Sequence, residues 1–331
     1  MKNILILGGT GFVGRLLTES LIKTDDKVTL FNRGKTNPGI FPEVNHIKGD
    51  RNTDDILKIV NTDWDTLVDF TGYFPDNIEM IAELLEGKVG RYIFISTGNA
   101  YSFEQMEKLN APVDESVETE KCTPEQRLDK NPMNYYGNKK AECERILLSL
   151  DWLDTIIFRP SLIYGRYDPT DRFYYWLYRA KKQDNFLMPD RGKSLFTNTF
   201  SEDFAKIIQE SITLEKHRKI YNASTHEPVS LREFVLKACD LLNTSPEILN
   251  APAEFLEKYE VIQWQDIAMW ISDFDMLFDN SRLKEDFDTK FHTFDESLEM
   301  TIEYYSALGW KLPRYGLSPD KENELIWKLP N

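Results

Sequence analysis

Side chains that could move a proton are concentrated in the stretch NYYGNKKAECE, where Tyr136 and Lys140 are four residues apart. On a helix that spacing puts both side chains on one face. A phenol has an ordinary pKa of about 10, so it needs a nearby cation before it can accept a proton at neutral pH. The same spacing recurs at Tyr135/Lys139 and at Tyr178/Lys182. The surrounding elements must therefore decide which pair could act in chemistry.

The segment ILILGGTGFVG, residues 4–14, passes from an apolar strand pattern into an amphipathic helix pattern. Its glycines fit both G-x-G-x-x-G and G-x-x-G-x-x-G. Glycines so placed allow a tight turn, close approach of the backbone to a pyrophosphate and close packing of helix on strand. The helix N-terminus adds free N–H groups and a positive dipole end. We predict a dinucleotide site whose turn comprises Gly8, Thr10, Gly11, Phe12, Val13 and Gly14.

The end of the second strand bears on which dinucleotide is bound. Such sites place an acidic residue about 20 residues after the glycines, on the adenosine ribose. Here the sequence is LFNRGK, with Asn32 and Arg33 at that place. A carboxylate would repel a 2′-phosphate, whereas a neutral Asn beside an Arg tolerates or binds one. The pattern favours NADP over NAD, and an ordinary surface turn at Arg33 is the alternative.

Composition limits the class of protein. A formal charge of −15 over 331 residues argues against a protein that works on nucleic acid or an anionic membrane. The three Cys and four His lack disulfide or metal-site spacing, so we expect no metal centre. No stretch approaches the roughly 20 apolar residues of a membrane span, and the first apolar run is too short for a signal peptide. We expect a cytoplasmic globular protein without a membrane or nucleic-acid partner.

The first half alternates apolar strands with helical patterns, which predicts an α/β fold of the Rossmann type. The strand runs are rich in Ile, Val and Phe without clean alternation, as in a doubly wound parallel sheet covered by helices on both faces. The run KIYNAS at 219–224 is expected to rejoin this sheet. We assign residues 1–165 plus about 195–225 to the dinucleotide-binding domain, and about 166–194 plus 226–331 to a smaller mixed α/β substrate domain.

The glycine turn, YIFISTGNAYS, YYGNKKAECE and FRPSLIYG together resemble the extended short-chain dehydrogenase/reductase superfamily, of the NAD-dependent epimerase/dehydratase type. The resemblance covers residues 1 to about 225. It implies an NAD(P)-dependent oxidoreductase or epimerase that acts on a hydroxyl or keto carbon of a small polar substrate, such as a nucleotide sugar. A homodimer is a further expectation from this resemblance.

The family's pattern carries over to individual positions of this chain. The catalytic set it implies is Thr97, Tyr136 and Lys140, with Ser96 as the alternative hydroxyl and Lys139 where the family has Ser. Asp50 and Arg51 match the adenine end of the cofactor site. Further cofactor contacts are expected from Phe70, Thr71, Gly72, Pro160 and Leu162.

The residues after Thr97 bear on the type of reaction. Sugar dehydratases of this family resemble one another in an Asp-Glu pair that directly follows the catalytic Thr. Gly98 and Asn99 stand there in this chain and cannot do acid–base work. This argues against a 4,6-dehydratase and leaves both an epimerase and a reductase open.

Two regions bear on substrate binding, and the sequence allows two interpretations of each. Arg166, Asp168 and Arg172 follow the strand beside the nicotinamide and are candidates to meet a polar or phosphorylated substrate, with domain packing as the alternative. The acidic segment 103–134 is either a solvated excursion or a lid. A non-catalytic NADP(H)-binding regulator and an RNA-binding relative of the fold are alternative functions. The retained Tyr–Lys pair argues against the first, and the charge of −15 argues against the second.

Overall fold

A seven-stranded parallel sheet forms the centre of the larger lobe. The computed structural model describes residues 1–109, 111–215, 218–272 and 274–329. The strand order is β11-β6-β5-β4-β1-β2-β3, with every pairing parallel. Its strands are β1 (Asn3–Leu7), β2 (Lys27–Asn32), β3 (Asn45–Lys48), β4 (Trp64–Asp69), β5 (Val89–Ile95), β6 (Asp154–Arg159) and β11 (Lys219–Asn222). The order reverses between β1 and β4, and ligands of such sheets bind at that switch point.

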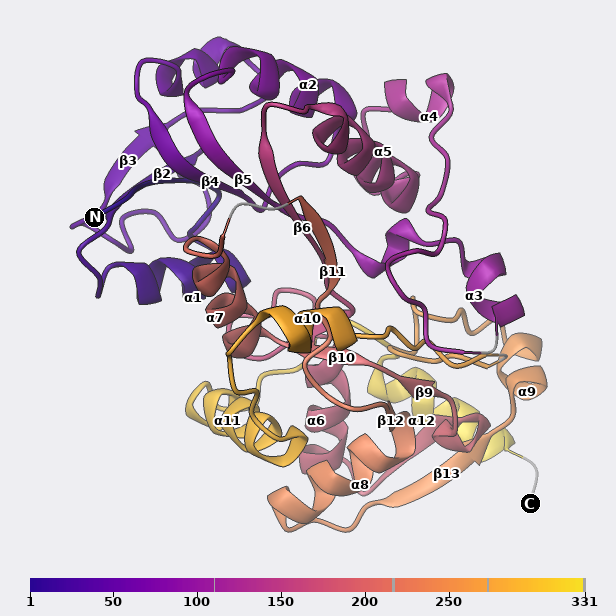
Figure 1. The fold of residues 1–331 in the computed structure, drawn as a ribbon. Helices are drawn as coiled ribbons and strands as arrows, with labels where there is room; N and C mark the ends of the chain where they lie inside the picture. The colour runs from indigo at the N-terminus through magenta and orange to yellow at the C-terminus, as the bar shows by residue number, and fades with distance from the viewer. Residues whose placement is uncertain (110, 216–217, 273, 330–331) are drawn as a thin grey trace.

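Alternate residues of each strand pack against different layers of helices. On β1, Ile4 and Ile6 face one layer, whereas Leu5 and Leu7 face the other. The first layer comprises α1 (Phe12–Leu21) and α7 (Ser201–Ser211), and the second comprises α2 (Pro75–Leu84) and α5 (Tyr136–Ser149) (Figure 1). This confirms the doubly wound Rossmann-type fold. It also explains the strand pattern, because strands buried on both faces are apolar at successive positions.

The apolar run 154–165 is divided into two strands. β6 ends at Arg159, and Pro160 and Ser161 separate it from β7 (Leu162–Tyr164). Proline has no backbone N–H to continue a ladder, and here the Pro160 carbonyl accepts a hydrogen bond from Gly98 N–H at 2.8 Å. β7 then pairs with β10 (Asn198–Phe200) outside the main sheet. The predicted return of residues 219–224 is confirmed, because β11 pairs with β6.

The smaller lobe surrounds an aromatic core and holds two further two-stranded sheets. β8 (Asn185–Pro189) pairs in parallel with β13 (Glu247–Ala251), and β9 (Leu195–Phe196) pairs antiparallel with β12 (Val229–Ser230). No described helix is long and apolar enough to cross a bilayer. The helices here are α6 (Arg172–Lys182), α8 (Leu231–Leu242), α9 (Ala253–Lys258), α10 (Ser281–Asp286), α11 (Phe294–Ala307) and α12 (Pro319–Lys328).

The acidic excursion is anchored to the larger lobe by two cations. It contains α3 (Phe103–Leu109) and α4 (Pro124–Leu128). Arg127 forms ion pairs with Asp76 and Glu79 of α2. The ammonium group of Lys139 is fully buried and donates to the carbonyls of Asp129 and Asn131 at 2.7 and 2.9 Å. These contacts fix the second half of the excursion against α2 and α5.

Candidate active site

The glycine turn connects β1 to α1 in a conformation that larger residues would disturb. Gly8 and Gly9 have φ angles of +115° and +84°, in the region that favours glycine. A Cβ at Gly9 would lie 2.6 Å from the Leu30 side chain, and one at Gly14 would lie 3.1 Å from the Gly9 nitrogen. The first turn of α1 contains no acidic residue. The turn therefore leaves a helix N-terminus open to an anion, which fits a pyrophosphate.

Asn32 and Arg33 have different roles at the end of β2. The Asn32 amide donates to the Gly8 carbonyl at 3.0 Å and accepts from Gly34 N–H at 2.9 Å, so it braces the glycine turn. Arg33 is exposed and lines the same cleft, as do Lys35 and Asp50. Two cations thus stand where an adenosine ribose would lie, which is compatible with a 2′-phosphate.

A buried ion pair lies beneath this end of the cleft. Arg51 Nη1 is 2.6 Å from Asp69 Oδ1 and 3.0 Å from the Thr71 hydroxyl, and the Tyr92 hydroxyl donates to Asp69 Oδ2 at 2.7 Å. Burial alone would raise the pKa of Asp69, but the charge and hydrogen bond of Arg51 hold it below its usual range. Arg51 Nε and Nη2 have no partner within the described chain. These orphaned donors, together with the glycine cradle, fit a cofactor rich in acceptor atoms.

Tyr136 and Thr97 line the opposite end of the cleft. Tyr136 begins α5, directly after Tyr135 in a left-handed conformation. Burial raises the pKa of Tyr136 above its ordinary value, Tyr73 adds to this rise, and a hydrogen bond with Thr97 and the charge of Arg172 oppose it. By contrast, the Ser96 hydroxyl donates to Glu144 within the core. The geometry therefore favours Thr97 over Ser96 as the hydroxyl that meets a substrate.

Lys140 lies one helical turn beyond Tyr136 and is only 2% exposed. Its ammonium donates to the Gly72 carbonyl at 3.0 Å and to the Ile95 carbonyl at 2.5 Å, and it lies 4.0 Å from the centroid of the Phe94 ring. Burial lowers the pKa of Lys140 to about 8. The group therefore remains mostly charged at neutral pH, on the helix face that carries Tyr136.

One cleft of about 880 Å³ joins the two ends. Its described walls include most of the predicted cofactor residues, with Phe70 and Thr71 on one side and Pro160 and Leu162 on the other. Gly72 is not among the described lining residues, and its carbonyl accepts a hydrogen bond from the Lys140 ammonium. The wall beyond Tyr136 is mainly apolar and comes from distant parts of the chain: Phe103, Pro132, Met133, Pro169, Trp264, Met276 and Phe278.

The three predicted substrate residues separate in the structure. Arg172 begins α6 and lines the cleft. Arg166 is outside the lining and pairs with Glu202 at 2.7 Å. Asp168 is buried, and its carboxylate accepts from both the backbone N–H and the hydroxyl of Thr170 at 2.8 Å. The structure brings only Arg172 to the site, and contact of the other two with a substrate stays a prediction.

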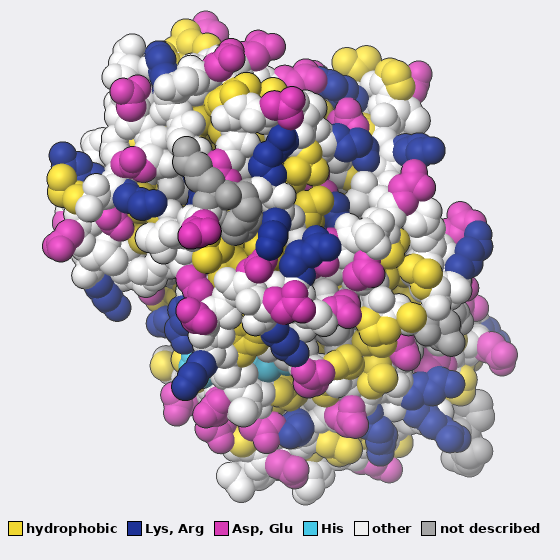
Figure 2. Space-filling view, viewed as in Figure 1, with side chains coloured by type: hydrophobic (Ala, Val, Ile, Leu, Met, Phe, Trp, Pro, Cys, Tyr) yellow, Lys and Arg dark blue, Asp and Glu magenta, His cyan; other side chains and the backbone are white. Residues whose placement is uncertain are grey.

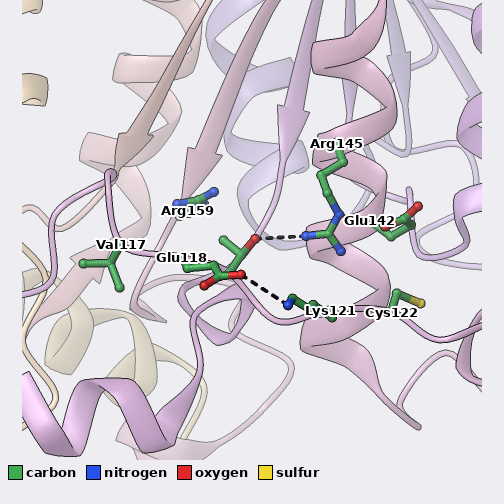
Figure 3. A pocket seen from close by; sticks show the side chains of 8 residues that line it. Val117, Glu118, Lys121, Cys122, Glu142, Arg145 and Arg159 are labelled. Carbon is green, nitrogen blue, oxygen red and sulfur yellow. Dashed lines mark hydrogen bonds and ion pairs between the residues drawn. The ribbon is translucent and has the colours of Figure 1, made fainter.

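A second recess, of about 570 Å³, lies on the outer side of α5 (Figure 3). Its polar side chains largely satisfy one another: Arg145 donates to Glu142 and Thr119, and Lys121 lies 3.8 Å from Glu118. Arg159 closes its inner side and binds Glu144 with two nitrogens. The recess offers a ligand few free polar groups, so we place the chemistry in the larger cleft.

The chain also matches a model of a known family. The family model described as NAD dependent epimerase/dehydratase family matches residues 4–224. The chain belongs to this family. The match includes the glycine turn, Thr97, Tyr136 and Lys140, and it ends just after β11.

Individual relatives of this family member are distant. The chain is 28% identical over 266 residues, 74% of its length, to the chloroplast stem-loop binding protein of 41 kDa b of Arabidopsis thaliana, and the match spans 64% of that relative's length. A UDP-N-acetylglucosamine 4-epimerase from Methanobrevibacter ruminantium M1 superposes with a TM-score of 0.72 at 19% identity, covering 93% of this chain and 99% of that one. A UDP-glucuronic acid 4-epimerase from Bacillus cereus, in complex with NAD, gives 0.71 at 15% identity over the same shares. The structural likenesses establish the fold.

Sequence reasoning missed the apolar wall of the cleft and the anchor of the excursion. Trp264, Met276 and Phe278 are more than 100 residues from Tyr136, and no local pattern connects them. Lys139 stands where the resemblance leads one to expect Ser, and this departure was the only signal that it has another role.

Proposed function

We propose that this family member is an NAD(P)-dependent epimerase that oxidises and re-reduces a hydroxyl-bearing carbon of a small polar substrate, such as a nucleotide sugar. The observation that carries the proposal is the convergence of Thr97, Tyr136 and Lys140 on one cleft with the glycine turn. The family match and the fold of nucleotide-sugar epimerases support it. A reductase that uses the same residues is the alternative function to be tested.

A nicotinamide cofactor held in this cleft would supply the hydride acceptor and donor that oxidation and re-reduction of the substrate carbon need. Tyr136 takes the hydroxyl proton during oxidation and gives it back during reduction. Thr97 forms a hydrogen bond to the same substrate oxygen and holds it against the phenol. Because burial raises the pKa of Tyr136, the nearby charge of Lys140 is needed to stabilise its phenolate form.

The lining of the cleft favours epimerisation over dehydration. Expulsion of water needs a second acid–base pair near the reacting carbon. Asp50 is the only carboxylate among the described lining residues, and it lies at the adenosine end. Gly98 packs against Phe278, where a Cβ would lie 2.7 Å from the ring. The position after Thr97 thus serves packing, and this supports redox chemistry at a single carbon.

NADP stays our expected cofactor on the basis of Arg33, with Lys35 as additional support, whereas the Bacillus cereus neighbour is in complex with NAD. The first experiment releases any bound nucleotide by denaturation and identifies it by mass spectrometry. Titration of the emptied protein with NAD and NADP follows. Near-stoichiometric retained nucleotide would favour an epimerase, and NAD as that nucleotide would contradict the role given to Arg33. Empty protein that prefers NADP would favour a reductase.

The proposed proton transfer is tested with Tyr136→Phe. We expect at least a 100-fold loss of kcat, because the phenol that exchanges the substrate proton is removed, and little change in the Kd of the cofactor. Tyr135→Phe is the matched control, since its ring is half-exposed at the preceding position. Turnover by Tyr136→Phe at the wild-type rate would refute the mechanism.

Nucleic-acid binding is the weaker alternative. The match to a stem-loop binding protein raises it, but Lys and Arg side chains alternate with Asp and Glu on the face shown in Figure 2. Binding to a phosphate backbone needs clustered cations. The cations of the cleft lie beside the glycine turn, where a dinucleotide explains them better.

A further inference from the structure

Positive charge is concentrated in the cleft of an otherwise acidic chain. The chain carries a formal charge of −15, yet the described lining of the cleft contains five cations and one carboxylate, Asp50. The proposed cofactor accounts for four of the cations. Arg33, Lys35 and Arg51 lie at the adenosine end, and Lys140 lies beneath the nicotinamide end. Arg172 is the cation that remains.

The Arg172 guanidinium has no direct ion-pair partner within the described residues, although its charge opposes the rise that burial causes in the pKa of Asp168. Its backbone N–H donates to the Thr170 hydroxyl, but no hydrogen bond or ion pair of its guanidinium is seen there. Other buried or half-buried arginines are paired: Arg159 with Glu144, and Arg179 with Glu322. In an acidic protein, an unpaired arginine in a cleft is well suited to bind an anion from a ligand.

The surroundings of Arg172 strengthen an interaction with an anion. Its guanidinium carbon is 5.9 Å from the centroid of the Trp264 ring, at the outer limit of a cation–π contact. Met276 and Phe278 form the adjoining wall. Apolar walls lower the local dielectric and make a charge-assisted hydrogen bond worth more than in water.

The position of Arg172 points to the reacting end of the substrate. Its charge reaches the Tyr136 phenol and lowers the pKa of that group against the effect of burial. Tyr136 marks the place of the reacting hydroxyl. An anion held by Arg172 would therefore lie near the carbon that is oxidised, not at the far end of the ligand.

We propose that the substrate is an acidic sugar or a similar hydroxy acid, whose carboxylate lies near the reacting carbon and binds Arg172. This inference rests on the proposed function and specifies its substrate class. The planar guanidinium can donate to both carboxylate oxygens in a bidentate pair, which an ammonium cannot reproduce. A neutral sugar would leave Arg172 unpaired beside an apolar wall.

The test compares two probes that differ only at one carbon, UDP-glucuronate and UDP-glucose. Their Kd values are measured by calorimetry on cofactor-loaded wild type, Arg172→Gln and Arg172→Lys. We expect the wild type to bind the uronate at least tenfold more tightly. Arg172→Gln should lose this preference, with the Kd of UDP-glucose changing less than threefold, and Arg172→Lys should keep part of it.

Lys181→Gln is the matched control, because it removes the same charge from the exposed, far end of α6. It should leave both Kd values unchanged. An equal loss for both probes in Arg172→Gln would show that Arg172 binds the diphosphate and would overturn the proposal. Wild type that binds both probes equally, or neither, would also overturn it. The proposed function is judged separately, by the retained nucleotide and by Tyr136→Phe.

Discussion

At the scale of single residues, Gly137 decides how closely Thr97 and Tyr136 can approach. A Cβ at this position would overlap the carbonyl oxygen of Asn99. Asn99 belongs to the short turn that begins after Thr97, and Tyr136 is the first residue of α5. The glycine therefore lets the turn carrying the hydroxyl pack directly on the helix carrying the phenol.

Gly137→Ala should reduce kcat at least tenfold and lower the stability by about 1–3 kcal/mol, because the added methyl group overpacks this contact. Enzyme assays and urea unfolding measure the two effects. Gly87→Ala is the control. Its φ of +72° makes the substitution strained, but a Cβ there meets no atom within 4 Å. It should lower stability by about 1–2 kcal/mol and leave kcat unchanged. Wild-type kcat in Gly137→Ala would contradict the packing argument.

At the scale of elements, the pair of Arg51 and Asp69 joins the segment after the edge strand β3 to the carboxyl end of β4, across the two strands that lie between them in the sheet. Arg51 follows β3, Asp69 ends β4, and Tyr92 of β5 donates to the same carboxylate. All three side chains are buried. Because these strand ends form the floor of the cleft, the pair supports the surface on which the cofactor is expected to lie.

Removal of one partner should leave an uncompensated buried charge. We expect Arg51→Gln and Asp69→Asn each to cost about 3–5 kcal/mol of stability, and the double variant to cost less than their sum. Urea unfolding of the four proteins measures the coupling. Lys58→Gln is the control, since its pair with Asp55 is solvent-exposed and should contribute little to stability. A double variant whose loss of stability equals the sum of the two single losses would refute the coupling.

At the scale of the whole molecule, a buried histidine lies where the two lobes meet. His226 Nδ1 is 2.8 Å from Asn198 Oδ1 of β10, and the imidazole packs against Tyr164 and Phe294. Burial lowers the pKa of His226 to about 4, although the charge of Asp203 opposes this shift. The folded protein therefore holds this imidazole neutral at pH values where the unfolded chain would protonate it.

The sign of the pH effect follows from that difference. The contribution of the neutral His226 to the free energy of unfolding is fully present above the unfolded pKa of about 6.5. It is lost as the pH falls towards 4. Between pH 7.5 and pH 5.0 we expect the free energy of unfolding to fall by up to about 2 kcal/mol more in the wild type than in His226→Gln. Urea unfolding at these two pH values measures this difference. Parallel pH dependences of the two proteins would contradict it.

The sequence by itself determined the features that depend on local spacing. The glycine pattern, the apolar strands and the alternating helices specified the Rossmann-type fold, because a parallel sheet buried on both faces imposes its pattern on each strand separately. The glycine turn, YIFISTGNAYS, YYGNKKAECE and FRPSLIYG together indicated the family, because each is a local pattern that can be read without the rest of the fold.

Only the tertiary structure decided which of several equivalent residues reach the cleft. It turned Ser96 towards Glu144 and left Thr97 beside Tyr136, and it paired Arg166 with Glu202 while Arg172 stayed without a direct ion pair in the described chain. It also brought Trp264 and Phe278 to the substrate end. These outcomes depend on contacts between segments far apart in the chain, and no local periodicity encodes such contacts.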